Sequence, residues 1–223
     1  MPRFPDLATA RAALAQSYAG VTAAVDELDD EALGTATRCD GWARDDLVFH
    51  LLCDAQRLLV ALATPTAAQP TTDAVDYWRP HGGDADDPWQ ALAHAQFVRL
   101  SAAAYSSPMV VVRHWRDTSA AAVRAADQAS DVQRYETQGY VLALPDLLTT
   151  FVVEAALHHL DLRVGTPQPG PLALVRFTLD GLLAGAPRPD WDDVTYALKA
   201  TGREAIDSDE SRVLADVRLP LLS

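Results

Sequence analysis

Residues 151–162 read FVVEAALHHLDL, an apolar run interrupted by a carboxylate, two adjacent histidines and a second carboxylate. The flanking sequence predicts a helix from Pro145 to about Val164, because a proline suits its first turn and a glycine and a proline follow its end. On such a helix Glu154 and His158 project within roughly 40° of each other. Apolar residues occupy the same stripe, at Leu147, Phe151 and Leu162. The sequence therefore predicts a buried helix whose inner face carries two polar groups.

Two polar groups on this face indicate a metal site, because a buried carboxylate is costly unless its charge is compensated. Glu154 and a neutral His158 can both bind a divalent cation, and His50, on the inner stripe of an earlier predicted helix, could complete the set. Three protein ligands leave coordination positions open, as in catalytic zinc sites. Asp161 is spaced to hold the other ring nitrogen of His158. The residues alone leave an alternative open, in which both histidines are ordinary core residues and Glu154 pairs with an arginine.

Helical patterns extend over most of the remaining chain. Helices are expected over residues 6–30, from about 45 to 63, 88–105, 108–129 and 172–183, with a shorter segment at 194–199. Residues 64–87 are rich in proline and glycine and indicate a loop, whereas residues 130–144 also suit a short extended segment. The chain is therefore predicted to be mainly α, with a four-helix bundle over residues 1–165 and a small C-terminal subdomain over residues 166–223.

Composition excludes several classes of function. The 223 residues carry a net charge of −13 with no basic stripe, which disfavours binding to nucleic acid. The N-terminus lacks the pattern of a secretion signal, and the longest apolar helical stretch, residues 47–62, is shorter than the roughly 20 residues that span a membrane. Two cysteines are too few for a disulfide framework. We expect a soluble cytoplasmic protein with no membrane association.

A second motif gives a family resemblance. Cys39, Asp40, Gly41 and Trp42 are followed by helix-opening acids and by His50, eight residues after the tryptophan. This opening resembles that of the mycothiol-dependent maleylpyruvate isomerase family, which belongs to the DinB-like metal-binding helical bundles. The family's second hallmark, a glutamate, a histidine four residues on and an aspartate three further on, is matched in order by Glu154, His158 and Asp161. The T-G-R sequence at 201–203 is similar to the family's C-terminal signature, so the resemblance spans roughly residues 6 to 205.

The resemblance implies a DinB-like bundle in which a divalent metal, zinc above all, is held by His50, Glu154 and His158. It further implies a thiol transferase or isomerase that uses mycothiol as its thiol cofactor, with isomerisation of maleylpyruvate as the reference activity. The metal would hold the thiol as a thiolate that attacks an electrophilic small molecule. A homodimer is compatible with the family resemblance. The alternatives are a metal-dependent hydrolase and a non-catalytic metal-binding or sensor module on the same bundle.

Arg203, in the T-G-R sequence, is the candidate catalytic residue. Its guanidinium could pair with a carboxylate of the substrate through two parallel hydrogen bonds. The alternative is a turn arginine on a solvated face.

The chain departs from the family pattern next to the tryptophan. Ala43 stands where a serine or threonine helix cap is frequent, a loss of about 1 kcal/mol that Asp45 partly offsets through the helix dipole. Asp40 stands where a proline is usual. Neither change touches the predicted ligands.

The remaining candidate ligands are not assigned to the site, because they face elsewhere on a helix, lie in a loop or lack a partner at ligand spacing. They are His81, His94, His114, His159, Cys39 and Cys53. Three acidic residues in the predicted loop are interpreted as solvated rather than as a calcium site; they are Asp84, Asp86 and Asp87.

Overall fold

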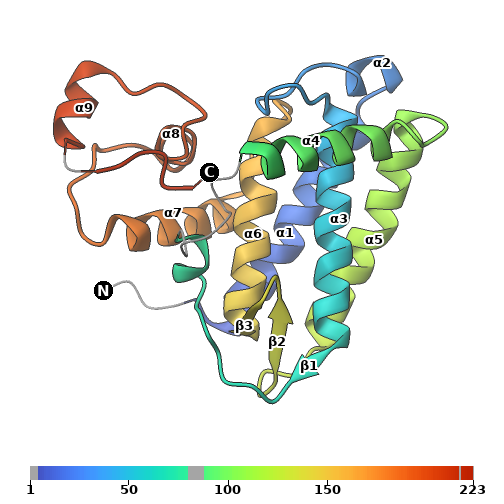
Figure 1. Ribbon diagram of the computed structural model, residues 1–223, viewed down its shortest axis with the longest axis horizontal. Helices are drawn as coiled ribbons and strands as arrows, with labels where there is room; N and C mark the ends of the chain where they lie inside the picture. The colour runs from blue at the N-terminus through green and yellow to red at the C-terminus, as the bar shows by residue number, and fades with distance from the viewer. Residues whose placement is uncertain (1–4, 80–87, 216, 223) are drawn as a thin grey trace.

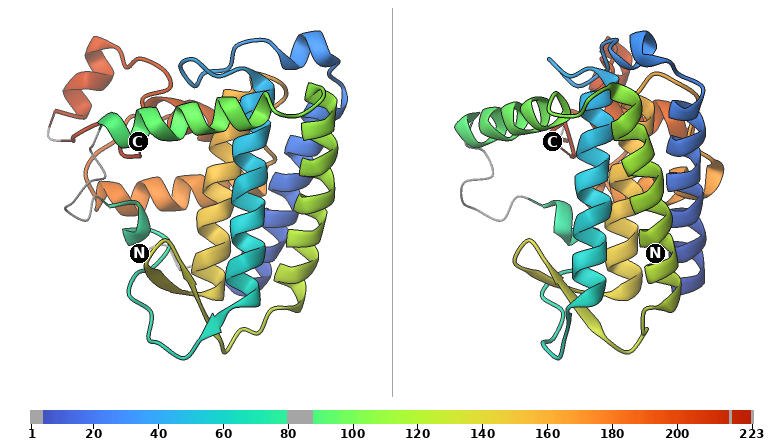
Figure 2. Two further views of the ribbon diagram at one scale, coloured as in Figure 1. Left: turned by 45° about the vertical axis from the view of Figure 1, so that its right-hand side comes forward. Right: turned by 90° about the vertical axis from the view of Figure 1, so that its right-hand side faces the viewer.

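Four long helices run side by side and form a bundle (Figure 1). They are α1 (Leu7–Asp26), α3 (Arg44–Ala63), α5 (Pro108–Gln128) and α6 (Leu144–Asp161). The computed structural model of the protein describes residues 5–79, 88–215 and 217–222. A further helix, α4 (Pro88–Ala102), runs across the direction of the bundle and packs against α3 (Figure 2). The prediction of a mainly helical bundle is confirmed.

Side-chain caps explain where the first helices begin. The Asp6 carboxylate accepts a hydrogen bond from the Thr9 amide at 2.8 Å and starts α1. Residues 6–30 were expected to form one helix, but the structure ends α1 at Asp26 and begins a short α2 (Asp30–Leu33). The reason is Asp29, whose carboxylate accepts from the backbone amide three residues ahead and so caps a new helix.

The expected capping defect at the start of α3 is offset by a neighbouring acid. Ala43 has no side-chain oxygen, yet its backbone amide donates to the Asp46 carboxylate at 2.9 Å. Asp46 therefore supplies one half of a capping box, from the position next to the Asp45 that the sequence suggested.

A small antiparallel sheet closes one end of the bundle. It consists of β1 (Pro65–Thr66), β2 (Arg134–Thr137) and β3 (Tyr140–Ala143), in that order. The ambiguous residues 130–144 thus contain a hairpin, turned by Gln138 and Gly139, both with positive φ. The expected loop at 64–87 contains β1 and a short 3-10 helix, η1 (Asp76–Trp78); its residues 80–87 lie outside the described part of the chain.

The C-terminal quarter of the chain lies to one side of the bundle (Figure 1). It contains α7 (Pro169–Leu183), α8 (Asp193–Ala200) and α9 (Ser208–Val213). The first two fall where the sequence predicts helical segments, and α9 was not predicted. Asp207 caps α9 by accepting from two backbone amides at 2.8 and 2.9 Å.

Buried apolar side chains form two clusters, and α6 contributes to both. Leu147 and Phe151 belong to the bundle cluster, whereas Leu157 and Leu160 pack with α7 and α8 in a C-terminal cluster. Burial on both faces explains why the α6 sequence is apolar almost all round. The division into domains at residue 165 stays a prediction.

Membrane insertion of a helix finds no support in the fold. Within the described parts of the chain, every helix is too short or too polar to cross a lipid bilayer.

Candidate metal centre

His50, Glu154 and His158 converge between α3 and α6, as the sequence predicts. Glu154 Oε1 lies 3.3 Å from His50 Nε2 and 3.6 Å from His158 Nε2. Ligand atoms about 2.1 Å from a tetrahedral cation are about 3.4 Å apart, so both separations suit one ion. One donor atom from each of the three residues lies within 4.8 Å of the other two. The arrangement therefore fits a divalent cation held by two imidazoles and a carboxylate.

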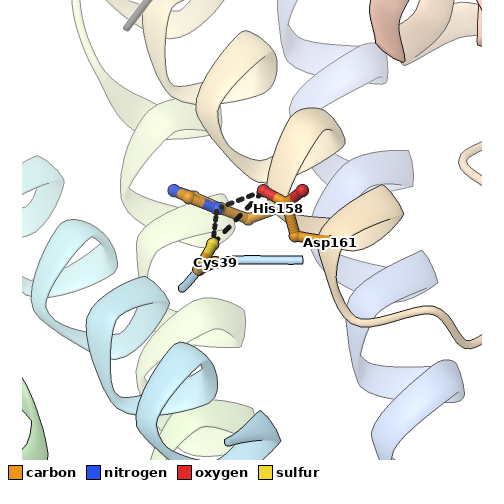
Figure 3. Close-up of side chains that lie close together, drawn as sticks. All are labelled: Cys39, His158 and Asp161. Atoms are coloured by element: carbon orange, nitrogen blue, oxygen red, sulfur yellow. Dashed lines mark hydrogen bonds and ion pairs between the residues drawn. The ribbon is translucent and has the colours of Figure 1, made fainter. Parts of the chain in front are cut away.

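The Nδ1 edge of the His158 ring, which faces away from Glu154, contacts Asp161 and Cys39 (Figure 3). His158 Nδ1 lies 3.0 Å from Asp161 Oδ2, and the Cys39 thiol donates to the same oxygen at 3.6 Å. Asp161 is 1% exposed, so its carboxylate is fixed. A hydrogen bond from Nδ1–H to a carboxylate leaves the lone pair of His158 on Nε2, which faces Glu154 and His50.

Cys39, His158 and Asp161 also meet the distance criterion for a metal site. Their geometry favours a supporting role, because Asp161 is already paired. Arg203 Nε donates to its two oxygens at 2.9 and 3.0 Å. A cation among these three residues would have to break both the Arg203 pair and the Asp161–His158 hydrogen bond.

Arg203 thus has a partner inside the chain. It follows α8 and reaches α6 across the boundary between the two clusters, with its side chain 20% exposed. Among the described residues, Arg203 does not line the cavity beside Glu154. Its expected pairing with a substrate carboxylate stays a prediction.

The site's charges stabilise one another. Burial favours a protonated Glu154, but hydrogen bonds to His158 and His50 outweigh it and hold the pKa of the carboxyl well below its usual value. Burial likewise opposes charge on His158, yet hydrogen bonds to Asp161, Cys39 and Glu154 raise the pKa of the imidazole well above its usual value. A bound cation would replace the proton on His158 Nε2, while Nδ1 keeps its proton toward Asp161.

Sequence reasoning missed Asp54, which lies one turn after His50 on α3. Its Oδ2 is 3.6 Å from His50 Nε2, and the residue is 8% exposed. Burial, and then the charge of Glu154, raise the pKa of Asp54, while Arg57 Nη2 lies 3.0 Å from its Oδ1. The signal was present, because His50 and Asp54 have the same four-residue spacing as Glu154 and His158.

Aromatic rings cover the His50 side of the centre. The Trp42 ring lies 5.4 Å from the His50 ring, between centroids, and the His94 ring of α4 lies at 5.5 Å. His94 was not predicted to be a ligand; it contacts the site because α4 crosses over α3. A ring contact does not make it a ligand, and it belongs to neither group of candidate ligands.

The other histidines of the described chain have different partners. His159 is 3% exposed and packs beneath Gly20, where an added Cβ would be 3.3 Å from the ring. His114 hydrogen-bonds the Tyr105 hydroxyl at 2.8 Å. His81, like the three loop aspartates, lies outside the described residues.

A cavity of about 160 Å³ adjoins the centre. Its lining residues come from α3, η1, the β2–β3 turn and α6, and they are Arg57, Tyr77, Trp78, Gln138, Thr150 and Glu154. Glu154 therefore faces both the candidate cation site and a space that a small molecule can enter.

The fold and this site define a helical-bundle protein with a candidate metal centre between two helices. A family model described as the mycothiol maleylpyruvate isomerase N-terminal domain matches residues 14–163, more than half of the chain. The chain belongs to the mycothiol maleylpyruvate isomerase family, and the resemblance seen in the sequence is confirmed.

Two solved structures resemble the chain in fold. One is a crystal structure of the mycothiol-dependent maleylpyruvate isomerase, with a TM-score of 0.56, and the other is a histidine-to-alanine mutant of that enzyme, with a TM-score of 0.57. Each is 15% identical to this chain, and each alignment covers 80% of this chain and 70% of the other. A comparison with curated protein sequences gave no significant match.

Proposed function

We propose that this chain is a metal-dependent enzyme that uses a thiol cofactor of the mycothiol type to isomerise, or transfer a thiol to, a small electrophilic molecule. The observation that carries the proposal is the convergence of His50 Nε2, Glu154 Oε1 and His158 Nε2, with Asp161 held against His158 Nδ1. Family membership supports the thiol cofactor. We propose zinc as the cation, because two imidazoles and one carboxylate with an open position suit it.

Each residue has a distinct part in this proposal. His50, Glu154 and His158 bind the cation, which, when bound, lowers the pKa of a thiol so that it reacts as a thiolate. Asp161 keeps the proton of His158 on Nδ1 and so presents Nε2 as a ligand. Arg203 enters as a positioning residue, because its contact with both oxygens of Asp161 fixes that carboxylate.

The proposal includes a division of labour along the chain. Residues 1–165 form the metal-binding bundle, and residues 166–223 form a small subdomain that supports it through Arg203. The separate apolar cluster of α7 and α8 against α6 supports this division. We also propose a cytoplasmic location, where small thiol cofactors are kept reduced.

The first prediction concerns Glu154→Gln. This variant keeps the size of the side chain but removes the charge that binds the cation, so we expect stoichiometric metal in the wild-type protein and none in the variant. Elemental analysis of protein purified without added metal measures this. Glu31→Gln, an exposed change on α2, is the matched control and should retain metal. A Glu154→Gln protein that keeps stoichiometric metal contradicts the site.

Thermal unfolding then distinguishes a thiol-dependent enzyme from a metal-dependent hydrolase and from a non-catalytic metal protein. A thiol cofactor that binds at the cation should raise the melting temperature of the metal-loaded protein and leave the metal-free protein unchanged. Metal binding without any thiol effect would contradict the thiol-dependent proposal and favour a hydrolase or a non-catalytic metal protein.

A further inference from the structure

Exposed apolar side chains gather on one helix, α4. In the described part of the chain seven large apolar side chains are exposed, and three of them lie singly on or near different elements: Val60, Val132 and Val213. The other four all belong to α4 and are between 48% and 76% exposed: Trp89, Leu92, Phe97 and Leu100. Single exposed hydrophobic residues are ordinary, whereas a gathered set marks an interaction surface.

The four side chains share one side of the helix, which we call the outer face of α4. At 100° per residue they fall within an arc of about 140°. Val98 and Ala102 lie on the opposite side, where they are buried as α4 packs against α3. The N-terminal part of α4 projects away from the bundle (Figure 2). Surface helices usually carry polar residues on the side that faces water, so the outer face of α4 has the composition of a covered surface.

The distribution of charge favours a second copy of this chain as the cover. The chain contains 31 acidic residues, yet none occurs from residue 88 to residue 116, and Arg99 is the only arginine, lysine, aspartate or glutamate within α4. Two copies with a net charge of −13 repel each other wherever acidic surfaces meet. That repulsion is weakest where the outer faces of α4 meet. Helices that bind membranes are rich in lysine and arginine, and α4 is not.

The spacing of the outer face is symmetric about one point. The midpoint of Trp89 and Leu100 lies between residues 94 and 95, and so does the midpoint of Leu92 and Phe97. Two antiparallel copies of α4, related by a two-fold axis at this point, therefore place the tryptophan of each copy opposite the leucine at the far end of the other. The inner leucine of each copy likewise meets the phenylalanine of the other. A two-fold dimer requires such a self-complementary set.

We propose that the outer face of α4 pairs with the same face of a second copy in an antiparallel two-fold dimer. An aromatic side chain offers about 150–250 Å², so Trp89 and Phe97 together expose on the order of 300 Å² on each copy, to which the two leucines add. Standard interfaces bury about 800 Å² on each partner, so this one belongs to the smaller, reversible class. The dimer therefore forms at micromolar protein concentrations.

A dimer through this face also acts on the candidate metal centre. His94 lies away from the outer face, and its ring is 5.5 Å from that of His50 and 6.2 Å from that of Trp42, between centroids. A second copy that holds α4 against α3 therefore holds this ring beside His50. The dimer itself is independent of the proposed function, because it uses the outer face alone.

Sedimentation velocity of the full chain at increasing concentration tests the proposal. We expect a reversible dimer with a dissociation constant of about 1–100 µM. Leu100→Glu places a charge in the interface twice and should weaken the dimer at least about tenfold. Val132→Glu, a matched change at an exposed site outside α4, should leave it unchanged. A wild-type protein that stays monomeric at about 500 µM, or a dimer that Leu100→Glu leaves intact, overturns the proposal.

A pair of charges tests the antiparallel register. Trp89→Glu and Leu100→Lys should each weaken self-association, because each variant loses both contacts between these two positions. In an equimolar mixture the introduced acid of one variant lies opposite the introduced base of the other, and the second such contact stays native. The mixed dimer should therefore be at least about tenfold tighter than either variant alone. A mixture that associates no more tightly than the separate variants contradicts the pairing, and with it the proposal.

Hydrogen exchange resolved by segment gives an independent readout. Amides of α4 should exchange more slowly above the dissociation constant than below it, and Leu100→Glu should remove that difference. Vesicles of anionic phospholipid provide the competing case. Protection of α4 by such vesicles, in a protein that remains monomeric without them, would identify a membrane surface and overturn the dimer.

Discussion

The bundle and the C-terminal region both pack on α6, but they do so through different faces. At 100° per residue, the bundle residues Leu147 and Phe151 lie on one side of the helix, and Leu157 and Leu160 lie on another. Glu154 and His158 lie on the bundle side, beside Leu147 and Phe151, and Asp161 lies between this side and that of Leu157. The comparison teaches that the polar site begins on the bundle face and extends, through Asp161, to the boundary with the C-terminal core, where Arg203 meets it.

The two regions also contribute differently to this boundary. The bundle supplies His50, whose Nε2 faces the candidate cation position. The C-terminal region supplies Arg203, which touches the opposite edge of the site through Asp161. In the proposed function, the bundle therefore binds the cation, and the C-terminal region positions Asp161.

The largest effect should come from removing a buried leucine in each region. Leu147→Ala and Leu179→Ala both truncate side chains that are 0% exposed, and each should lower the free energy of unfolding by about 2–5 kcal/mol. Leu147→Ala should weaken amide protection in every helix of the bundle. Leu179→Ala should act first on α7 and α8. Hydrogen exchange resolved by segment measures both, and equal loss of protection everywhere in the two variants contradicts a separable subdomain.

A smaller effect is expected from cutting the link between the regions. Arg203→Gln leaves all three proposed ligands in place but frees Asp161, so metal affinity should fall about 10–100-fold. A competition assay with a chelator measures the affinity, and the nitrogen shifts of His158 report its tautomer. Arg212→Gln, an exposed change on α9, should alter neither. Unchanged affinity together with an unchanged tautomer would mean that the C-terminal region does not position the site.

The smallest effect is the response to pH. Because the pKa of His158 is raised, its contribution to the stability of the metal-free protein is full below about pH 6.5 and is lost as the pH rises through the folded value. The pKa of Glu154 is depressed, so its contribution is present above about pH 4.5 and lost as the pH falls. A metal ion must displace the proton on His158 Nε2. Apparent metal affinity should therefore rise about tenfold per pH unit below the folded pKa of His158. Affinity that does not change with pH contradicts this.

The contrast between contacts within one helix and contacts between regions explains what could be predicted from the sequence. Helix periodicity and the Glu154–His158 spacing are local, so the long helices and one half of the site follow from neighbouring residues. The family motif supplied His50, which the structure brings to the same point. Family and fold are confirmed, whereas the ligand roles stay predictions.

Contacts between residues far apart in the sequence could not be predicted from local sequence patterns. Arg203 meets Asp161 across 42 positions, and β1 pairs with a strand that lies far along the chain. His94 reaches the site only because α4 folds across α3. Spacing within one helix cannot reveal such partners, since tertiary packing decides them.

The proposed ligand set is divided along the chain, with His50 and Glu154 separated by 104 positions. No growing polypeptide can assemble it until α6 has left the ribosome and docked on α3. In the proposed function, cation uptake therefore follows closure of the bundle, and a bound ion indicates a completed fold. A chelator should accordingly lower the stability of the whole bundle in one step rather than loosen a single segment.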